Sequence, residues 1–146
     1  MPTYKIVNTL IGKIHRAMRH FFECQIKKYD ITPPQFEVLM TLWQEDGLFL
    51  SEIGRRLSRD GPTITGIIDR MEKKNLLTRK RSNRDRRIIQ VMLTNKAIEM
   101  KENLMKMQKQ TSQDITKNLT TADIAMLEKL LQKILQNIDG KILPKS

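Results

Sequence analysis

A dense group of cations stands near the middle of the chain, where six arginines and lysines fall within nine residues: Arg79, Lys80, Arg81, Arg84, Arg86 and Arg87. Like charges held this close repel one another, so the segment is costly to fold unless an anion meets it. An arginine on a narrow loop can enter the minor groove of DNA, where A·T-rich sequence concentrates negative potential. We expect Asp85 to orient the guanidinium of Arg87 by a charge-assisted hydrogen bond. A solvated basic loop is the alternative interpretation.

A second candidate surface precedes it, on a predicted helix over residues 62–74. Opposite its apolar side, the helix carries polar, small and charged residues: Pro62, Thr63, Thr65, Gly66, Asp69, Arg70 and Lys73. A helix in the major groove needs short polar groups near its start, where base edges are closest, and cations further along for phosphates. We expect Asp69 to orient a nearby arginine. A solvated helix face is again the alternative.

Charge is concentrated around these two surfaces. The 146 residues carry a net charge of +11, and residues 51–94 hold 12 Lys/Arg against 5 Asp/Glu, or +7. The flanking segments 1–50 and 95–146 carry only +1 and +3. A basic centre between nearly balanced ends is typical of a phosphate-binding module, with Lys80, Arg84, Arg86 and Arg87 as its contacts. An anionic membrane surface or an acidic protein partner would attract the same cluster.

Other functional classes lack their motifs. There is no phosphate-cradling Gly-rich loop, no Gly-x-Ser-x-Gly and no Cys/His pair of recognisable spacing, so we expect no enzyme and no cofactor. His15 and His20 are five residues apart, which does not suit a helical metal pair. Without a signal peptide or membrane span, and with Cys24 alone, we expect a cytoplasmic protein that does not engage a membrane.

Apolar periodicity predicts long helices at both ends of the chain. Residues 5–28 repeat apolar side chains at helical spacing, with a seven-residue recurrence that suits packing against another long helix. Thr94 and Thr120 each cap a further helix, the first running to Asn118. Their apolar stripes exceed what one small domain can cover, so we predict a homodimer through two groups of side chains: Val7, Leu10, Ile14 and Phe21, and Leu127, Leu131 and Ile134.

Between these helices the sequence predicts a helix-turn-helix followed by a hairpin. Thr32 and Gln35 form a capping box, and residues 48–50 are a short strand candidate. Ser51 is expected to cap the next helix, and the helix from residue 62 ends at Asn75. Strands over 77–81 and 87–93 would flank a turn at 82–85.

These residues resemble the MarR family of regulators over nearly the whole chain. The wing pattern Asp-x-Arg-x5-Leu-Thr is present as Asp85, Arg87, Leu93 and Thr94. Three further segments fall in family order: Thr32-Pro33-Pro34-Gln35-Phe36, Ser51-Glu52-Ile53-Gly54-Arg55-Arg56-Leu57 and Asp69-Arg70-Met71-Glu72-Lys73-Lys74. Gly66 departs from the family, which often has a larger, frequently basic residue there.

The resemblance implies a mainly α fold with a small β-hairpin wing. In this interpretation residues 1–146 form one domain, in which 5–30 and 95–140 are dimerisation helices and 31–94 the winged helix-turn-helix. It implies that residues 62–73 enter the major groove, while Arg87 and Arg86 reach the minor groove.

The implied function is a regulator that binds a palindromic operator in double-stranded DNA as a homodimer. We expect a repressor, although activation fits the same residues because the outcome depends on where the operator lies relative to the promoter. The family further implies release by a small aromatic or anionic effector. Some relatives sense peroxides through a cysteine near the start of the first helix, but here Cys24 lies about four turns later. We therefore expect Cys24 to be a buried small apolar residue, with a redox role as the alternative.

Overall fold

The computed structural model describes residues 2–141, which form six helices and one two-stranded antiparallel sheet. The elements run in the order α1 (Thr3–Lys27), α2 (Pro33–Gln44), α3 (Leu50–Arg56), α4 (Gly61–Lys73), β1 (Leu77–Arg81), β2 (Ile89–Leu93), α5 (Asn95–Ile115) and α6 (Thr121–Lys141). This confirms the predicted mainly α fold with a hairpin wing. The chain divides into two compact units at residue 108, and each is described by itself.

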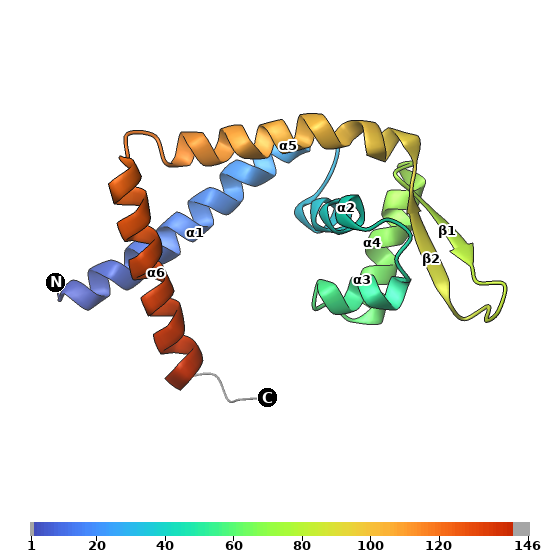
Figure 1. Ribbon diagram of the computed structural model, residues 1–146, viewed down its shortest axis with the longest axis horizontal. Coiled ribbons are helices and arrows are strands. Elements are labelled where there is room, and N and C mark those ends of the chain that lie inside the picture. The colour runs from blue at the N-terminus through green and yellow to red at the C-terminus, as the bar shows by residue number, and fades with distance from the viewer. Residues whose placement is uncertain (1, 142–146) are drawn as a thin grey trace. The chain divides into compact units, whose positions relative to one another are not determined.

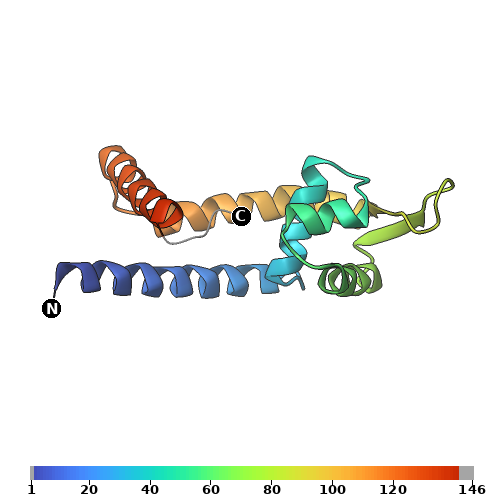
Figure 2. The ribbon, with the colours of Figure 1, turned by 90° about the horizontal axis from the view of Figure 1, so that it is seen from below.

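Within the first unit, α2, α3 and α4 gather beside the β1–β2 hairpin (Figure 1). The hairpin extends past these helices, as Figure 2 also shows. The predicted inward face of α4 is buried, and it packs with side chains from every other element of this unit to form the core: Ile26, Val38, Leu39, Leu42, Ile53, Ile64, Ile67, Ile68, Met71, Leu77, Val91 and Leu104.

Aromatic contacts hold the amino-terminal part of this unit together. The rings of Phe22 and Phe36 meet edge to face with centroids 5.1 Å apart, and Trp43 packs against Phe36 at 6.2 Å. The indole N–H of Trp43 donates to the carbonyl of Ala97 at 3.0 Å, so the aromatic group also ties α2 to α5.

Local sequence signals place most helix ends. The capping box at the start of α2 is present, because Thr32 and Gln35 each accept the other's backbone N–H through their side chains. Thr94 accepts the N–H of Ala97 at the start of α5. After α4, Asn75 takes the left-handed conformation with φ of 59°, as predicted for this helix end.

Some of the predicted element boundaries are wrong. Residues 48–50 do not form a strand: Phe49 makes a single bridge to Gln90, and Leu50 already begins α3. Consequently Ser51 lies inside the helix, and Phe49 is the N-cap, with its carbonyl accepting from Glu52 and Ile53. The second strand starts at Ile89, two residues late, because the turn before it uses the N–H groups of Arg87 and Ile88.

The second unit contains the end of α5 and α6. The start of α6 is capped by a reciprocal pair, in which Thr120 accepts from the N–H of Asp123 and Asp123 accepts from the N–H of Thr120. These bonds lower the pKa of the Asp123 carboxyl. Helix α5 ends at Ile115, three residues before the predicted Asn118. None of the described helices combines the length and the apolar character that a membrane crossing requires.

Candidate nucleic-acid interface

The start of α4 is fixed by a side-chain cap. The carboxylate of Asp60 accepts the N–H of Thr63 at 2.8 Å, and this bond lowers the pKa of Asp60. Pro62 lies in the first turn, where its missing N–H costs nothing. The cap therefore holds the first turn, with the side chain of Thr63 exposed to solvent.

The outward face of α4 is polar and accessible, as the periodicity predicted. Pro62, Thr63, Arg70 and Lys73 are exposed, while Thr65 and Gly66 are half-buried. The guanidinium of Arg70 lies over Gly66, since a Cβ added to Gly66 would be 3.5 Å from Nη1 of Arg70. That distance is ordinary van der Waals contact, so alanine fits at this position without displacing a neighbour.

The wing tip is a turn that is closed by backbone and side-chain bonds. Ser82 donates its N–H to the carbonyl of Ile88 at 2.8 Å, and the Ser82 hydroxyl oxygen accepts the N–H of Arg84 at 3.2 Å. Asp85 accepts the N–H of Arg87 through its side chain at 2.9 Å and the N–H of Ile88 through its carbonyl at 3.0 Å.

The expected role of Asp85 therefore needs correction. Within residues 2–141, no ion pair joins its carboxylate to the guanidinium of Arg87; the carboxylate bonds the backbone N–H of that residue instead. At a separation of two residues, an aspartate reaches the following backbone more easily than it reaches the end of a long side chain. Asp85 thus orders the turn that carries the arginines.

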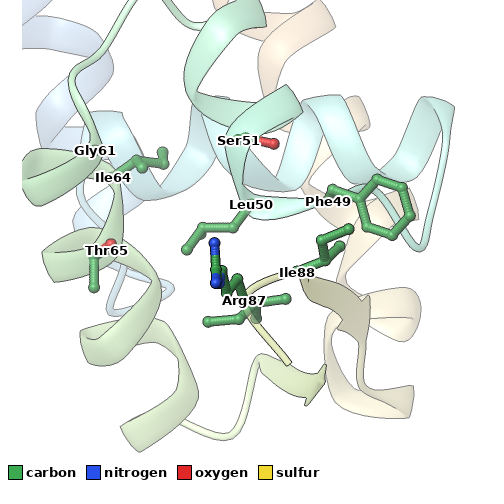
Figure 3. Close-up of a pocket in the computed structure, with 9 residues that line it drawn as sticks. Phe49, Leu50, Ser51, Gly61, Ile64, Thr65, Arg87 and Ile88 are labelled. Atoms are coloured by element: carbon green, nitrogen blue, oxygen red, sulfur yellow. The ribbon is translucent and has the colours of Figure 1, made fainter. Parts of the chain in front are cut away.

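Arg87 lines a hollow of about 240 Å³ between the wing and the helices. The other lining residues come from the loop and start of α3, from the first half of α4, and from the junction of the tip turn with β2: Phe49, Leu50, Ser51, Gly61, Ile64, Thr65, Ile88 and Ile89. Figure 3 shows the guanidinium of Arg87 among these side chains. Arg84 and Arg86 lie in the same exposed turn as Arg87 but do not line the hollow. Of these three arginines, Arg87 is therefore the one that the structure places beside α4.

One hairpin cation is turned toward α4. Arg79 forms an ion pair with Asp69, and its Nη2 lies 3.1 Å from Oε1 of Glu72. The prediction that Asp69 orients a nearby arginine is confirmed. Sequence reasoning missed Glu72, although its position three residues after Asp69 on the same helix face was a usable signal. The interaction lowers the pKa of Glu72 and raises that of Arg79.

The remaining hairpin cations have no such partner. In the part of the chain that the structure describes, Lys80, Arg81, Arg84, Arg86 and Arg87 make no ion pair. The cations of α3 differ, because Arg55 and Arg56 bond to Glu52 and bring the pKa of that carboxyl down to about 2. Free positive charge on this surface is therefore concentrated on the wing and the end of α4.

A second lysine near the end of α4 has a structural role. Lys74 donates to the carbonyl of Asp30 at 2.6 Å and to the side chain of Gln35 at 3.1 Å. These bonds tie the end of α4 to the junction between α1 and α2. Lys73, its neighbour, is exposed and remains available for an anion.

The predicted dimerisation residues are exposed apolar side chains in the single chain. On α1, Ile14 is 52% exposed, and on α6 Leu131 is 45% exposed. Four other predicted dimerisation residues are also exposed: Val7, Leu10, Phe21 and Leu127. Ile134 is half-buried. Large apolar surface of this extent is typical of an interaction face.

Cys24 is exposed, contrary to the expectation that it is buried. Helix α1 buries only Ile26, and a residue two positions away on a helix points about 200° from it. Its sulfur lies 3.7 Å from Nε2 of His20. Among the described residues, no group of three His, Cys, Asp or Glu side chains has the arrangement of a metal site.

Comparison with known proteins agrees with this geometry. The family model of the MarR family matches residues 31–89, which span α2 to the start of β2. The organic hydroperoxide resistance transcriptional regulator of Bacillus subtilis is 34% identical over 81% of this chain and 84% of its own. The HTH-type transcriptional regulator MgrA of Staphylococcus aureus is 29% identical over 90% and 88% of the two chains.

Solved structures give the same result. The MepR–DNA complex of S. aureus matches with a TM-score of 0.74 and 26% identity, over 89% of this chain and 96% of that one. Wild-type MarR from E. coli in its apo form matches with a TM-score of 0.73 and 28% identity, over 92% and 97%. The chain therefore belongs to the MarR family and is a DNA-binding transcriptional regulator with a winged helix.

Proposed function

We propose that this protein is a cytoplasmic homodimeric repressor that binds a palindromic operator and releases it when a small effector binds. The observation that carries the proposal is the pairing of a polar outer face on α4 with unpaired cations on the adjacent wing. A recognition helix supplies base contacts and a basic wing supplies phosphate and minor-groove contacts.

In the proposed complex α4 lies in the major groove. Thr63 and Thr65 are at its start, where a hydroxyl can bond a base edge and a methyl can meet the methyl of thymine. Pro62 is exposed in the first turn, and Gly66 has no side chain, so α4 can approach the duplex closely when the guanidinium of Arg70 moves from its place over Gly66 to the DNA. Arg70 and Lys73, further along, would contact phosphate or guanine.

The wing would follow the backbone into the neighbouring minor groove. Lys80 and Arg84 are placed for phosphates, and Arg86 for the groove itself. Arg87 would also reach the groove, which requires its side chain to leave the hollow beside α4. An exposed arginine changes rotamer readily, so DNA can draw it out.

Dimerisation would cover the apolar stripes of α1 and α6. A second copy of the chain is the partner we propose, since a palindromic operator needs a protein with twofold symmetry. Complete burial of a fully exposed leucine or isoleucine is worth about 1.5–3 kcal/mol. Because Ile14 and Leu131 are 52% and 45% exposed in the single chain, each would add roughly half of that on dimerisation.

A cavity of about 350 Å³ is the site we propose for the effector. It is lined by side chains of α1, of α2 and of the loop before α4: His15, Arg19, Phe22, Pro33, Pro34, Glu37 and Arg59. Phe22 and the prolines offer apolar contact, while Arg19, whose Nε donates to Glu23 at 2.9 Å, offers its remaining N–H groups and its charge. The carboxylate of Glu37 is neutralised by Nη2 of Arg59 at 2.8 Å. Within the described residues, Nε of Arg59 is buried without a hydrogen-bond partner, which favours a ligand with an acceptor. A small aromatic carboxylate combines these properties.

Selection of operators from random duplex DNA tests the proposal. We expect a palindromic sequence, bound by two chains as measured by analytical ultracentrifugation of the complex. Benzoate and related aromatic carboxylates should then displace the operator from wild type, but not from Arg19→Ala, whose own operator affinity should be unchanged. Failure to enrich any sequence would refute operator binding. One chain per site would refute the dimer, and release equal in both proteins would refute the cavity.

A further inference from the structure

We propose that Arg79 is a positioning residue: it fixes the wing against α4 and so sets discrimination between operator and other DNA, without contacting DNA itself. The inference rests on the proposed reading of an operator by α4 and the wing.

The contacts of Arg79 define an orientation as well as a distance. Its Nη1 pairs with Asp69, its Nη2 lies 3.1 Å from Oε1 of Glu72, and its Nε donates to Oε2 of Glu72 at 3.3 Å. Three donors of one planar group thus engage two carboxylates from the same helix face. A guanidinium held in this way resists rotation, whereas a lysine ammonium would act as a point charge.

Core packing cannot orient the outer part of the wing. Leu77 on β1 and Val91 on β2 are the last buried side chains of the two strands, and no residue from 80 to 88 is buried. Arg79 is paired with Val91 in the sheet and follows Leu77 by two positions, so it shares the face toward α4. It is therefore the outermost attachment of β1 to the recognition helix.

Strand β2 is held on its other side by different groups. The N–H of Val91 donates to the carbonyl of Leu48 at 2.9 Å, and the side chain of Gln90 donates to the carbonyl of Gly47. These bonds attach the wing to the loop between α2 and α3. Among the described residues of β1, Arg79 is the one with a polar contact to α4, and this contact lies further along the strand than the buried side chain of Leu77. In our proposal it therefore sets the angle between the outer wing and α4, and that angle decides whether base contacts and groove contacts form together.

The contact of Arg79 with Asp69 and Glu72, called the Arg79 clamp below, also explains why a helix proposed to bind DNA carries two carboxylates. Asp69 and Glu72 are 45% and 40% exposed, and both face Arg79. Without the guanidinium, two negative charges one helical turn apart would repel the phosphates. A test of the proposal must therefore keep the positive charge of residue 79 while it removes the planar guanidinium group.

Arg79→Lys meets this requirement, and Lys80→Gln is the matched control. Lys80 is adjacent, exposed and unpaired, so its loss removes a charge without touching the clamp. On a selected operator, we expect Arg79→Lys to weaken binding by roughly threefold to tenfold, while affinity for random duplex and the salt dependence stay unchanged. Lys80→Gln should weaken both duplexes alike and reduce the salt slope by about one.

A direct measurement of wing orientation uses no DNA. Spin labels at Thr63→Cys on α4 and Asn83→Cys at the wing tip, in a Cys24→Ser background, report the distance between the two elements. We expect a narrow distribution with Arg79 and a broader or shifted one with Arg79→Lys. Glu72→Gln should have the same effect, and combined with Arg79→Lys it should add little, because both variants break one contact.

The label distances and the DNA affinities of Arg79→Lys together show whether Arg79 positions the wing or contacts phosphate. An unchanged label distance together with wild-type discrimination in Arg79→Lys would overturn the proposal. Equal weakening on operator and random duplex would make Arg79 a phosphate contact, which also overturns it. If wild type selects no operator, the proposed function fails, and the label distances still decide whether Arg79 orients the wing.

Discussion

Replacement of Asp85 by alanine separates turn ordering from simple charge attraction. The carboxylate of Asp85 accepts the N–H of Arg87 at 2.9 Å, and the carbonyl of the same residue accepts the N–H of Ile88 at 3.0 Å. Asp85→Ala removes only the first bond, so the hairpin should remain but its tip should lose order. We expect weaker operator binding, although the substitution removes a negative charge from a surface that meets phosphate.

The magnitude follows from one exposed hydrogen bond. A net contribution of about 1 kcal/mol to the ordered turn is typical of such a bond. DNA binding must then order the tip at the same cost, so the affinity should fall by about fivefold. Coulomb attraction acts in the opposite direction, because the variant gains one unit of positive charge at the interface.

Asp85→Asn is the matched control. Asparagine can accept the same backbone N–H in the same turn, but carries no charge. We therefore expect Asp85→Asn to bind the operator at least as tightly as wild type, with Asp85→Ala weaker than both. Thermal melting of the three proteins should show similar stability, since the turn is exposed and remote from the core.

Fluorescence anisotropy titrations at several salt concentrations provide the assay. The loss in Asp85→Ala should be larger on operators with A·T-rich flanks, where the minor groove is narrow. The combination of Asp85→Ala with Arg87→Ala should lose less than the sum of the single losses, because both act at one turn. If Asp85→Ala binds as tightly as Asp85→Asn on both flank types, turn ordering has no role and the wing acts by charge alone.

Four further predictions concern other parts of the molecule. Lys73→Ala should weaken binding to operator and to random duplex equally and lower the slope of affinity against salt concentration by about one. Thr63→Ala should instead reduce the difference in binding free energy between operator and random duplex by roughly 1–3 kcal/mol. Titrations on both duplexes distinguish these outcomes. Ile14→Glu and Leu131→Glu should yield folded monomers in sedimentation experiments, since both side chains are exposed in the single chain, and persistence of the dimer in both variants would refute the proposed interface. Gly66→Ala should stabilise the protein to thermal unfolding by up to about 1 kcal/mol, while Gly66→Arg should crowd Arg70 and lower operator affinity; tighter specific binding by Gly66→Arg would contradict close approach. Because Arg79 lowers the pKa of Glu72 below its usual 4.5, this pair stabilises the fold fully above that pH and progressively less as pH falls through the lowered value. In Glu72→Gln this loss of stability on acidification should be absent. Identical dependence of the unfolding free energy on pH in wild type and Glu72→Gln would contradict the prediction.

Local signals in the sequence predicted most of the fold. Helix periodicity identified the buried face of α4, because side chains three and four positions apart share one side of a helix. Thr32 with Gln35, and Thr120 as a cap, were recognisable since a cap involves only residues within one turn. The left-handed helix end at Asn75 was predictable for the same reason.

The errors occur where distant segments compete for the same groups. The segment 48–50 has strand-forming residues, but Leu50 is taken into α3 and only Phe49 bridges to the hairpin. Cys24 lies among apolar residues of α1, yet this helix is buried at Ile26, which points to another side, so Cys24 is exposed. Periodicity reports that a helix has an apolar face, and it does not report how much of that face its own chain covers.

The sequence by itself determined the order of the six helices and the hairpin, the basic wing and the polar face of α4. The tertiary structure alone decided which charges remain available for DNA. Arg79 is occupied by Asp69 and Glu72, and Lys74 by groups some 40 residues away along the chain. Lys73 and Lys80, in contrast, are exposed and pair with no group in residues 2–141. The physical reason is that an ion pair depends on the separation of two side chains in space, and for residues on different elements that separation is set by packing of the core between them.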